Sequence, residues 1–133
     1  MSNQTDLEKL QEELVGYAIQ IADSFQIRLD YSDKSIKKVK KILSKIHKDY
    51  KKSKNDEGLN GIALEFVFYI IKVIENNHDK GKLERNHVDF GDDSFPYFWN
   101  DSTIFPYSWC LKRIFDGKSD NIWSKYKTLI SNK

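Results

Sequence analysis

The stretch IALEFVFYIIKVI, from Ile62 to Ile74, is the feature that most constrains how this chain can fold. Only Glu65 and Lys72 interrupt its apolar residues, so a helix built from it is apolar on nearly all sides. The stretch is shorter than the roughly 20 residues that a helix needs to span a bilayer. It therefore predicts a buried central helix, from about Glu57 to Asn77, and not a membrane anchor.

Two amphipathic helices are expected before this central helix. Apolar residues recur at helical spacing over residues 6–24 and again over residues 33–51, where Ser32 stands in the position of an N-cap. The second segment gives one apolar stripe, made of Ile36, Val39, Leu43 and Ile46. Residues 25–32 alternate apolar and polar side chains; of a short strand and an extended connector, we favour the connector.

After the central helix the pattern changes to short apolar runs, which predict a small antiparallel sheet. The runs begin with Leu83, Val88 and Phe90. A strand is expected around residues 95–99, a turn at residues 100–102, and a returning strand at residues 103–105. Because Pro96 removes one donor from the hydrogen-bond ladder, it favours an edge position for its strand.

Two further helices are expected at the end of the sequence. Pro106 suits the first turn of a helix that stops at Gly117, and Ser119 can cap a last helix. A length of 133 residues fits one domain. The sequence thus predicts an α+β fold in a single domain, residues 1–133: a helical pair plus a central buried helix packed on a small antiparallel sheet, with C-terminal helices.

Basic charge is concentrated in one block of the sequence. Residues 34–54 contain ten lysines and one acid, Asp49, although the net charge of the whole chain is only +2. Four of these lysines fall on one face of the predicted helix and are candidate electrostatic contacts: Lys37, Lys41, Lys45 and Lys48. Such a face can neutralise phosphates, yet no aromatic or amide side chain interleaves it to read bases. The alternative is a solvated face, partly balanced by the acidic first helix packed beside it.

The segment FPYFWNDSTIFPYSW, residues 95–109, holds a dense group of aromatic side chains. A short sheet closing over the central helix needs several of them in its core, because each buries about 150 to 250 Å². We expect those inside the core to be Phe95, Phe105 and Trp109. We expect the rest to line a groove open to solvent, where they would serve as protein-binding residues: Tyr97, Trp99 and Tyr107.

Residues with catalytic potential are present but form no recognisable constellation. Glu65 is the only acid inside the apolar helix, and Cys110 lies in an apolar setting where an inert thiol is expected. His47 is expected to be exposed on the lysine-rich helix. The spacing of the acids and histidines in the loops around the sheet matches no zinc or calcium pattern: His78, His87, Asp89, Asp92 and Asp93. We expect no catalytic residues, no metal and no cofactor.

The order of motifs resembles uncharacterised small bacterial domains of unknown function. The likeness lies in the "LDYS-x2-SI" helix start from Leu29 to Ile36, the central helix with its Glu, and a Pro-led helix with an Arg and a Gly near the C-terminus. Leu64 stands where those domains usually have a Gly before the Glu. The resemblance implies an α+β fold and marks three positions to test: Glu65, Arg113 and Gly117.

These patterns favour binding over catalysis. We expect a non-enzymatic, cytoplasmic protein of a bacterium or phage that binds another protein, in the manner of an immunity or inhibitor protein. The single cysteine excludes an internal disulfide and fits an intracellular setting, and we expect no membrane partner. The alternative is nucleic-acid binding of low sequence specificity through the lysine-rich helix, residues 33–52.

Overall fold

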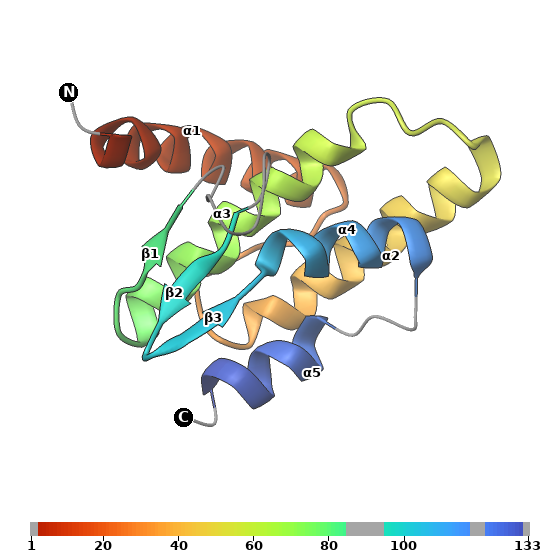
Figure 1. The fold of residues 1–133 in the computed structure, drawn as a ribbon. Helices are drawn as coiled ribbons and strands as arrows, with labels where there is room; N and C mark the ends of the chain where they lie inside the picture. Colours follow the sequence, from red (N-terminus) through yellow and green to blue (C-terminus); the bar gives the residue numbers. More distant parts are fainter. Residues whose placement is uncertain (1–2, 85–94, 118–121, 132–133) are drawn as a thin grey trace.

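The computed structural model describes residues 3–84, 95–117 and 122–131, with side chains from residue 9 to residue 130 within these ranges. It is mostly helical with a three-stranded antiparallel sheet, so the predicted α+β fold is confirmed (Figure 1). The three long helices are α1 (Asn3–Ser24), α2 (Ser35–Ser53) and α3 (Leu59–Asn77). None of the described helices is both long and apolar enough to cross a membrane.

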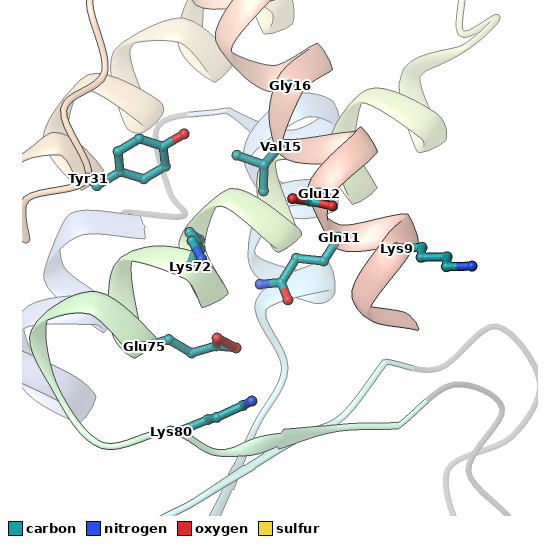
Figure 2. Close-up of a pocket in the computed structure, with 9 residues that line it drawn as sticks. All are labelled: Lys9, Gln11, Glu12, Val15, Gly16, Tyr31, Lys72, Glu75 and Lys80. Atoms are coloured by element: carbon teal, nitrogen blue, oxygen red, sulfur yellow. The ribbon is translucent and has the colours of Figure 1, made fainter. Parts of the chain in front are cut away.

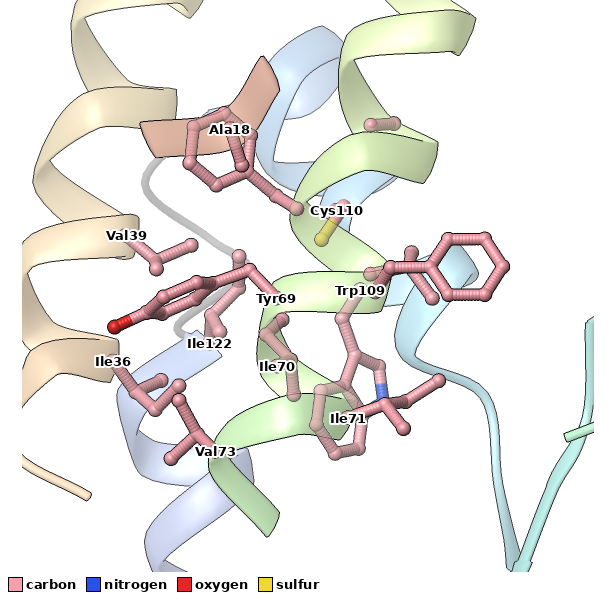
Figure 3. Packing of buried hydrophobic residues seen from close by; sticks show 14 of the residues in the cluster. Ala18, Ile36, Val39, Tyr69, Ile70, Ile71, Val73, Trp109, Cys110 and Ile122 are labelled. Carbon is pink, nitrogen blue, oxygen red and sulfur yellow. The ribbon is translucent and has the colours of Figure 1, made fainter. Parts of the chain in front are cut away.

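Helix α3 is the central helix that its sequence predicts. It is buried from Phe66 to Ile71 without interruption, and again at Val73 and Ile74. Helix α1 packs along one side of α3, and α4 (Pro106–Asp116) packs along another (Figure 1). Tyr69 extends from α3 toward Ile36 and Val39 of α2, so that the helices share one core (Figure 3).

Helix α2 presents one apolar stripe to the rest of the molecule. The stripe predicted from the sequence is buried, and Ile42 joins it: Ile36, Val39, Ile42, Leu43 and Ile46. The helix starts through a tight turn, in which the backbone N–H of Ser35 lies 3.2 Å from Ser32 Oγ and 3.0 Å from Ser32 O. Ser32 thus supplies a side-chain acceptor in the turn before the helix, but the N-cap of the regular helix is Lys34, which makes no side-chain cap bond. Residues 25–34 connect α1 to α2 without a strand, as predicted.

The sheet consists of β1 (Lys82–Leu83), β2 (Tyr97–Trp99) and β3 (Ser102–Ile104), with β2 in the middle. Asn100 and Asp101 both have positive φ, at 46° and 63°, which is the geometry of a tight hairpin turn between β2 and β3. The prediction that Pro96 marks an edge strand is wrong. Pro96 lies just before β2, and its carbonyl accepts a hydrogen bond from Glu84 N at 3.1 Å. Val88 and Phe90 lie outside the described residues.

The C-terminal helices cover the stripe of α2. Helix α4 begins at Pro106 and ends at Gly117, whose φ of 87° no other residue type adopts easily. Helix α5 (Ile122–Tyr126) continues as one turn of π-helix, Lys127–Ser131. Both α4 and α5 pack against α2. Ser119, the predicted cap of the last helix, lies outside the described residues.

Candidate functional site

The lysine face of α2, defined as Lys37, Lys41, Lys45 and Lys48, is exposed along its whole length. At 1.5 Å per residue it runs about 16 Å along the helix. None of its four lysines forms an ion pair with a described acidic residue. The acidic helix α1 packs against α3, whereas α2 packs against α4 and α5 (Figure 1). The expectation that α1 lies beside α2 and balances its charge is therefore wrong.

One aromatic residue lies at the end of this face, and sequence reasoning did not place it there. The ammonium of Lys37 lies 5.0 Å from the centre of the Trp123 ring of α5. The same ring stacks on Tyr126, with ring centres 6.3 Å apart. Trp123 belongs to the apolar pattern of the last helix, and only the packing of α5 on α2 brings it to the lysines. Its ring is already engaged by two neighbours.

The aromatic segment is core over most of its length. Phe95 and Trp109 are buried, as predicted, while Phe105 keeps part of its surface exposed. Tyr97 is 1% exposed and Trp99 is 4% exposed, so the prediction that these two line a groove open to solvent is wrong. Tyr107 is half-buried and meets the Phe95 ring edge to face, with centres 5.2 Å apart.

Backbone partners explain why Tyr97 and Trp99 are buried despite their polar groups. The Tyr97 hydroxyl accepts a hydrogen bond from Gly81 N at 2.8 Å. The Trp99 indole N–H donates to the carbonyl of Asp79 at 2.6 Å. Burial raises the pKa of Tyr97 to about 12, so the hydroxyl stays neutral over the ordinary pH range. Because each polar group has a partner inside the fold, neither ring needs contact with water.

Three polar side chains, those of Asp33, His78 and Tyr126, link the residue stretches just before α2 and just after α3 to α5. His78 Nε2 lies 2.9 Å and 3.1 Å from the two carboxylate oxygens of Asp33, and the Tyr126 hydroxyl donates to the same carboxylate. Burial, together with this contact, raises the pKa of Tyr126. His78 is thus part of a structural link, and no group of three metal-binding side chains occurs within the described residues. The other acids and histidines of these loops, whose spacing matches no metal pattern, lie outside the described residues: His87, Asp89, Asp92 and Asp93.

The "LDYS" segment is held by a neighbouring set of hydrogen bonds. The Tyr69 hydroxyl lies 2.7 Å from Ser35 Oγ and accepts from Tyr31 N at 3.0 Å. Asn77 Nδ2 donates to the Tyr31 carbonyl at 2.8 Å. Tyr69 comes from the central helix, so these bonds fix the start of α2 against α3. The bonds at Tyr31 use its backbone N–H and carbonyl, so they fix the path of the chain, and from the "LDYS-x2-SI" stretch only Ser35 takes part through its side chain.

Arg113 and Gly117 both belong to the junction of α2 with α4. Arg113 is only 4% exposed and donates to Ser44 Oγ of α2. A Cβ at Gly117 would lie 2.6 Å from Nε2 of His47. His47 Nδ1 in turn lies 2.8 Å from the carbonyl of Ile114, and its ring is half-buried. The expectation that His47 is exposed is therefore wrong.

Burial has the same effect on the pKa values of Glu65 and Cys110. Glu65 is partly buried in α3, and desolvation raises its pKa. Cys110 is completely buried, and desolvation raises the pKa of its thiol. A buried, protonated thiol is a poor nucleophile. Among the described contacts, neither residue is joined to a base or an oxyanion-binding group in the way that catalysis requires.

Comparison with protein-family models, with curated proteins and with solved structures finds no match to this chain. The resemblance noted from the motifs stays a prediction. The candidate site therefore rests on the geometry of the molecule, in which the four lysines of the lysine face are exposed without ion pairs to described acids.

Proposed function

We propose that this protein acts by binding another macromolecule through the lysine face of α2, without catalysis, and that the partner is an acidic protein surface. The observation that carries the proposal is the exposure of Lys37, Lys41, Lys45 and Lys48 without ion pairs to described acids. A binding role without catalysis is the one that an immunity or inhibitor protein of a bacterium or phage would have. The proposed site of action is the cytoplasm, since Cys110 is a single buried thiol.

The anchoring of α2 supports this role. Five apolar residues hold the opposite face of the helix in the core, and Ser32 fixes its start. The four ammonium groups are therefore carried on a backbone that needs no ordering when a partner arrives, which lowers the entropic cost of binding. A row of like charges on a rigid helix also speeds the encounter with a surface of opposite charge.

Nucleic acid is the alternative partner, because the same spacing of ammonium groups can neutralise phosphates. The described surroundings of the lysine face favour a protein. The one aromatic ring beside it, Trp123, is already in contact with Lys37 and Tyr126. Base stacking on this ring would have to displace Lys37. Any nucleic-acid binding would then depend on phosphate contacts alone and have little sequence preference.

Fluorescence anisotropy at low and physiological salt tests the proposal with three labelled probes: an acidic Glu/Asp peptide, a DNA duplex and a single-stranded oligonucleotide. We expect the peptide to bind in a salt-dependent way. Binding should be lost in the variant that changes all four lysines of the face to Gln. It should persist in a control that carries the same charge change elsewhere, with Gln at Arg28, Lys82, Lys112 and Lys127, all of them exposed.

The other outcomes are equally decisive. Oligonucleotide binding that is tighter than peptide binding, and that disappears only in the lysine-face variant, would replace the acidic protein with nucleic acid. Equal loss in the face variant and in the control would mean that net charge, and not this face, drives association. Absence of binding to all three probes at low salt would overturn both partners.

A further inference from the structure

A cavity of about 680 Å³ opens between α1, the C-terminal half of α3 and the segment that follows α3 (Figure 2). Val15 of α1 and the Tyr31 ring contribute its apolar surface. Its polar lining consists of Lys9, Gln11, Glu12, Lys72, Glu75 and Lys80. This volume lies within the range of about 300 to 1,000 Å³ typical of small-molecule sites. The cavity lies along α1, and α1 does not pack beside the lysine face.

Both signs of charge line the cavity. Three lysines and two glutamates face it from separate elements, yet none of the five forms an ion pair with a described residue. Figure 2 shows the Glu75 carboxylate and the Lys80 ammonium entering the same space without meeting. The two carboxylates would repel a ligand with several negative charges, and the three ammonium groups would repel a simple cation. A ligand that carries both charges satisfies both sets.

The amide of Gln11 adds a directional requirement. Its nitrogen, Nε2, is buried and has no hydrogen-bond partner. In Figure 2 the Gln11 side chain extends from α1 into the space bounded by Glu75 and Lys80. Leaving a buried donor unsatisfied costs stability, so such groups in folded proteins usually have partners. A turn of the Gln11 amide toward the open cavity would let a ligand oxygen supply the missing acceptor.

We propose that this cavity binds a small zwitterion, a molecule with one ammonium and at least one carboxylate group. The ligand carboxylate accepts a hydrogen bond from Gln11 Nε2 and pairs with the ammonium groups of Lys72 and Lys80. The ligand ammonium pairs with Glu75 and Glu12. A free α-amino acid and a short peptide share this chemistry, and three lysines against two glutamates favour a ligand of net charge zero or −1.

Isothermal titration calorimetry on the full chain tests the assignment. The probes are glutamate, glutamine and diglycine, with glutarate and putrescine as matched molecules that lack the ammonium or the carboxylate. We expect a zwitterion to bind, and glutarate and putrescine to bind at least about tenfold more weakly. Comparison of the amino acids with diglycine distinguishes a free amino acid from a peptide. Equal binding of glutarate or putrescine, or no zwitterion binding at about 10 mM, would overturn the proposal.

Two variants locate the binding, and a third serves as the control. Glu75→Gln and Gln11→Leu should each weaken zwitterion binding by about tenfold or more. Gln11→Leu also removes the unpartnered donor, so its thermal midpoint should equal or exceed that of the parent; a folding defect therefore does not explain its loss of binding. Glu57→Gln, at an exposed position outside the cavity, should bind as the parent does. Unchanged affinity in both cavity variants would place the ligand elsewhere.

The four-lysine variant of α2 separates this inference from the proposed function. It leaves every cavity residue in place, so it should bind the zwitterion as the parent does. Loss of zwitterion binding in that variant would overturn the cavity assignment, whatever the acidic peptide does.

Discussion

Helices α2 and α3 have the same length, 19 residues each, but use their surfaces in opposite ways. Six residues of α2 are buried, all on one face, and its lysines occupy the other. Ten residues of α3 are buried, and two of its charged residues, Lys72 and Glu75, face the cavity that α3 shares with α1. The difference comes from their neighbours: α4 and α5 cover one side of α2, whereas α1 and α4 enclose α3.

This contrast separates two kinds of polar surface. The lysines on the outer face of α2 lie in a row along the helix and are exposed to solvent, which suits an extended partner. Charge on α3, at Lys72 and Glu75, lies in a seam with α1 and faces a cavity, which suits a small one. The two proposed sites thus differ in scale, and each is tied to one of the two helices.

The largest expected effect is that of a charge placed in the buried stripe of α2. Replacing Ile46 by Asp should destabilise the protein by about 3 to 5 kcal/mol, because the new carboxylate would be buried without a partner. Lys45→Asp, one residue away on the exposed side, should change stability by no more than about 0.5 kcal/mol. Urea unfolding followed by circular dichroism measures both. Similar losses in the two variants would mean that α2 is not one-sided.

A smaller effect is expected where α4 ends against α2. Gly117→Ala should cost about 2 kcal/mol, because φ is 87° and the new Cβ would lie 2.6 Å from His47 Nε2. Gly16→Ala is the matched control, since it lies inside α1 and a Cβ there would have no neighbour within 4 Å. That change should raise stability by about 0.5 to 1 kcal/mol. A neutral Gly117→Ala in thermal denaturation would show that α4 tolerates displacement from α2.

The smallest effect concerns the polar strip of α3 and has a defined pH dependence. Burial raises the pKa of Glu65, so the folded state favours the neutral carboxyl more than the unfolded state does. The contribution of Glu65 to stability is therefore fully present below the unfolded pKa, and it is lost as pH rises through the folded pKa. Relative to Glu65→Gln, the parent should lose stability between about pH 4 and neutrality.

Urea unfolding at a series of pH values measures this difference. The partial exposure of Glu65 keeps the effect below about 1 kcal/mol. Glu57→Gln, at an exposed position just before α3, is the matched control. A parent that gains stability over Glu65→Gln as pH rises would contradict the assigned direction and would mean that the folded protein stabilises the charged carboxylate.

Periodicity predicts the elements well, because it reflects local burial. The stripe of α2, the central position of α3 and the hairpin at Asn100 and Asp101 all follow from spacing or turn chemistry between near neighbours. Which side chains of residues 95–109 are exposed cannot be predicted from spacing between near neighbours. Tyr97 and Trp99 share one face of β2, and the groups that satisfy them, Gly81 N and Asp79 O, lie in a segment far from β2 in the sequence.

The charge arrangement depends on which helices become neighbours in space, and sequence order does not determine this. Helices α1 and α2 are consecutive and of opposite charge, which suggests a pair, but the apolar surface of α3 packs against α1 instead. Because α1 packs against α3 and not against α2, the lysine face of α2 stays exposed, and the cavity beside Gln11 forms between α1 and α3. The four lysines of the lysine face follow from spacing within one helix, whereas the cavity could not be found from a motif, since segments distant in the sequence define it.

The link between Asp33 and Tyr126, which spans 93 positions, has a consequence for synthesis on the ribosome. The helices that cover the stripe of α2 are α4 and α5, and both follow it late in the chain. At about 5 to 20 residues per second, the stretch from residue 53 to residue 122 takes roughly 3 to 14 s to translate. The stripe of α2 therefore stays incompletely covered until both helices are made, α4 first and α5 last. We expect the packing of α2 to be completed only after α5 has been synthesised.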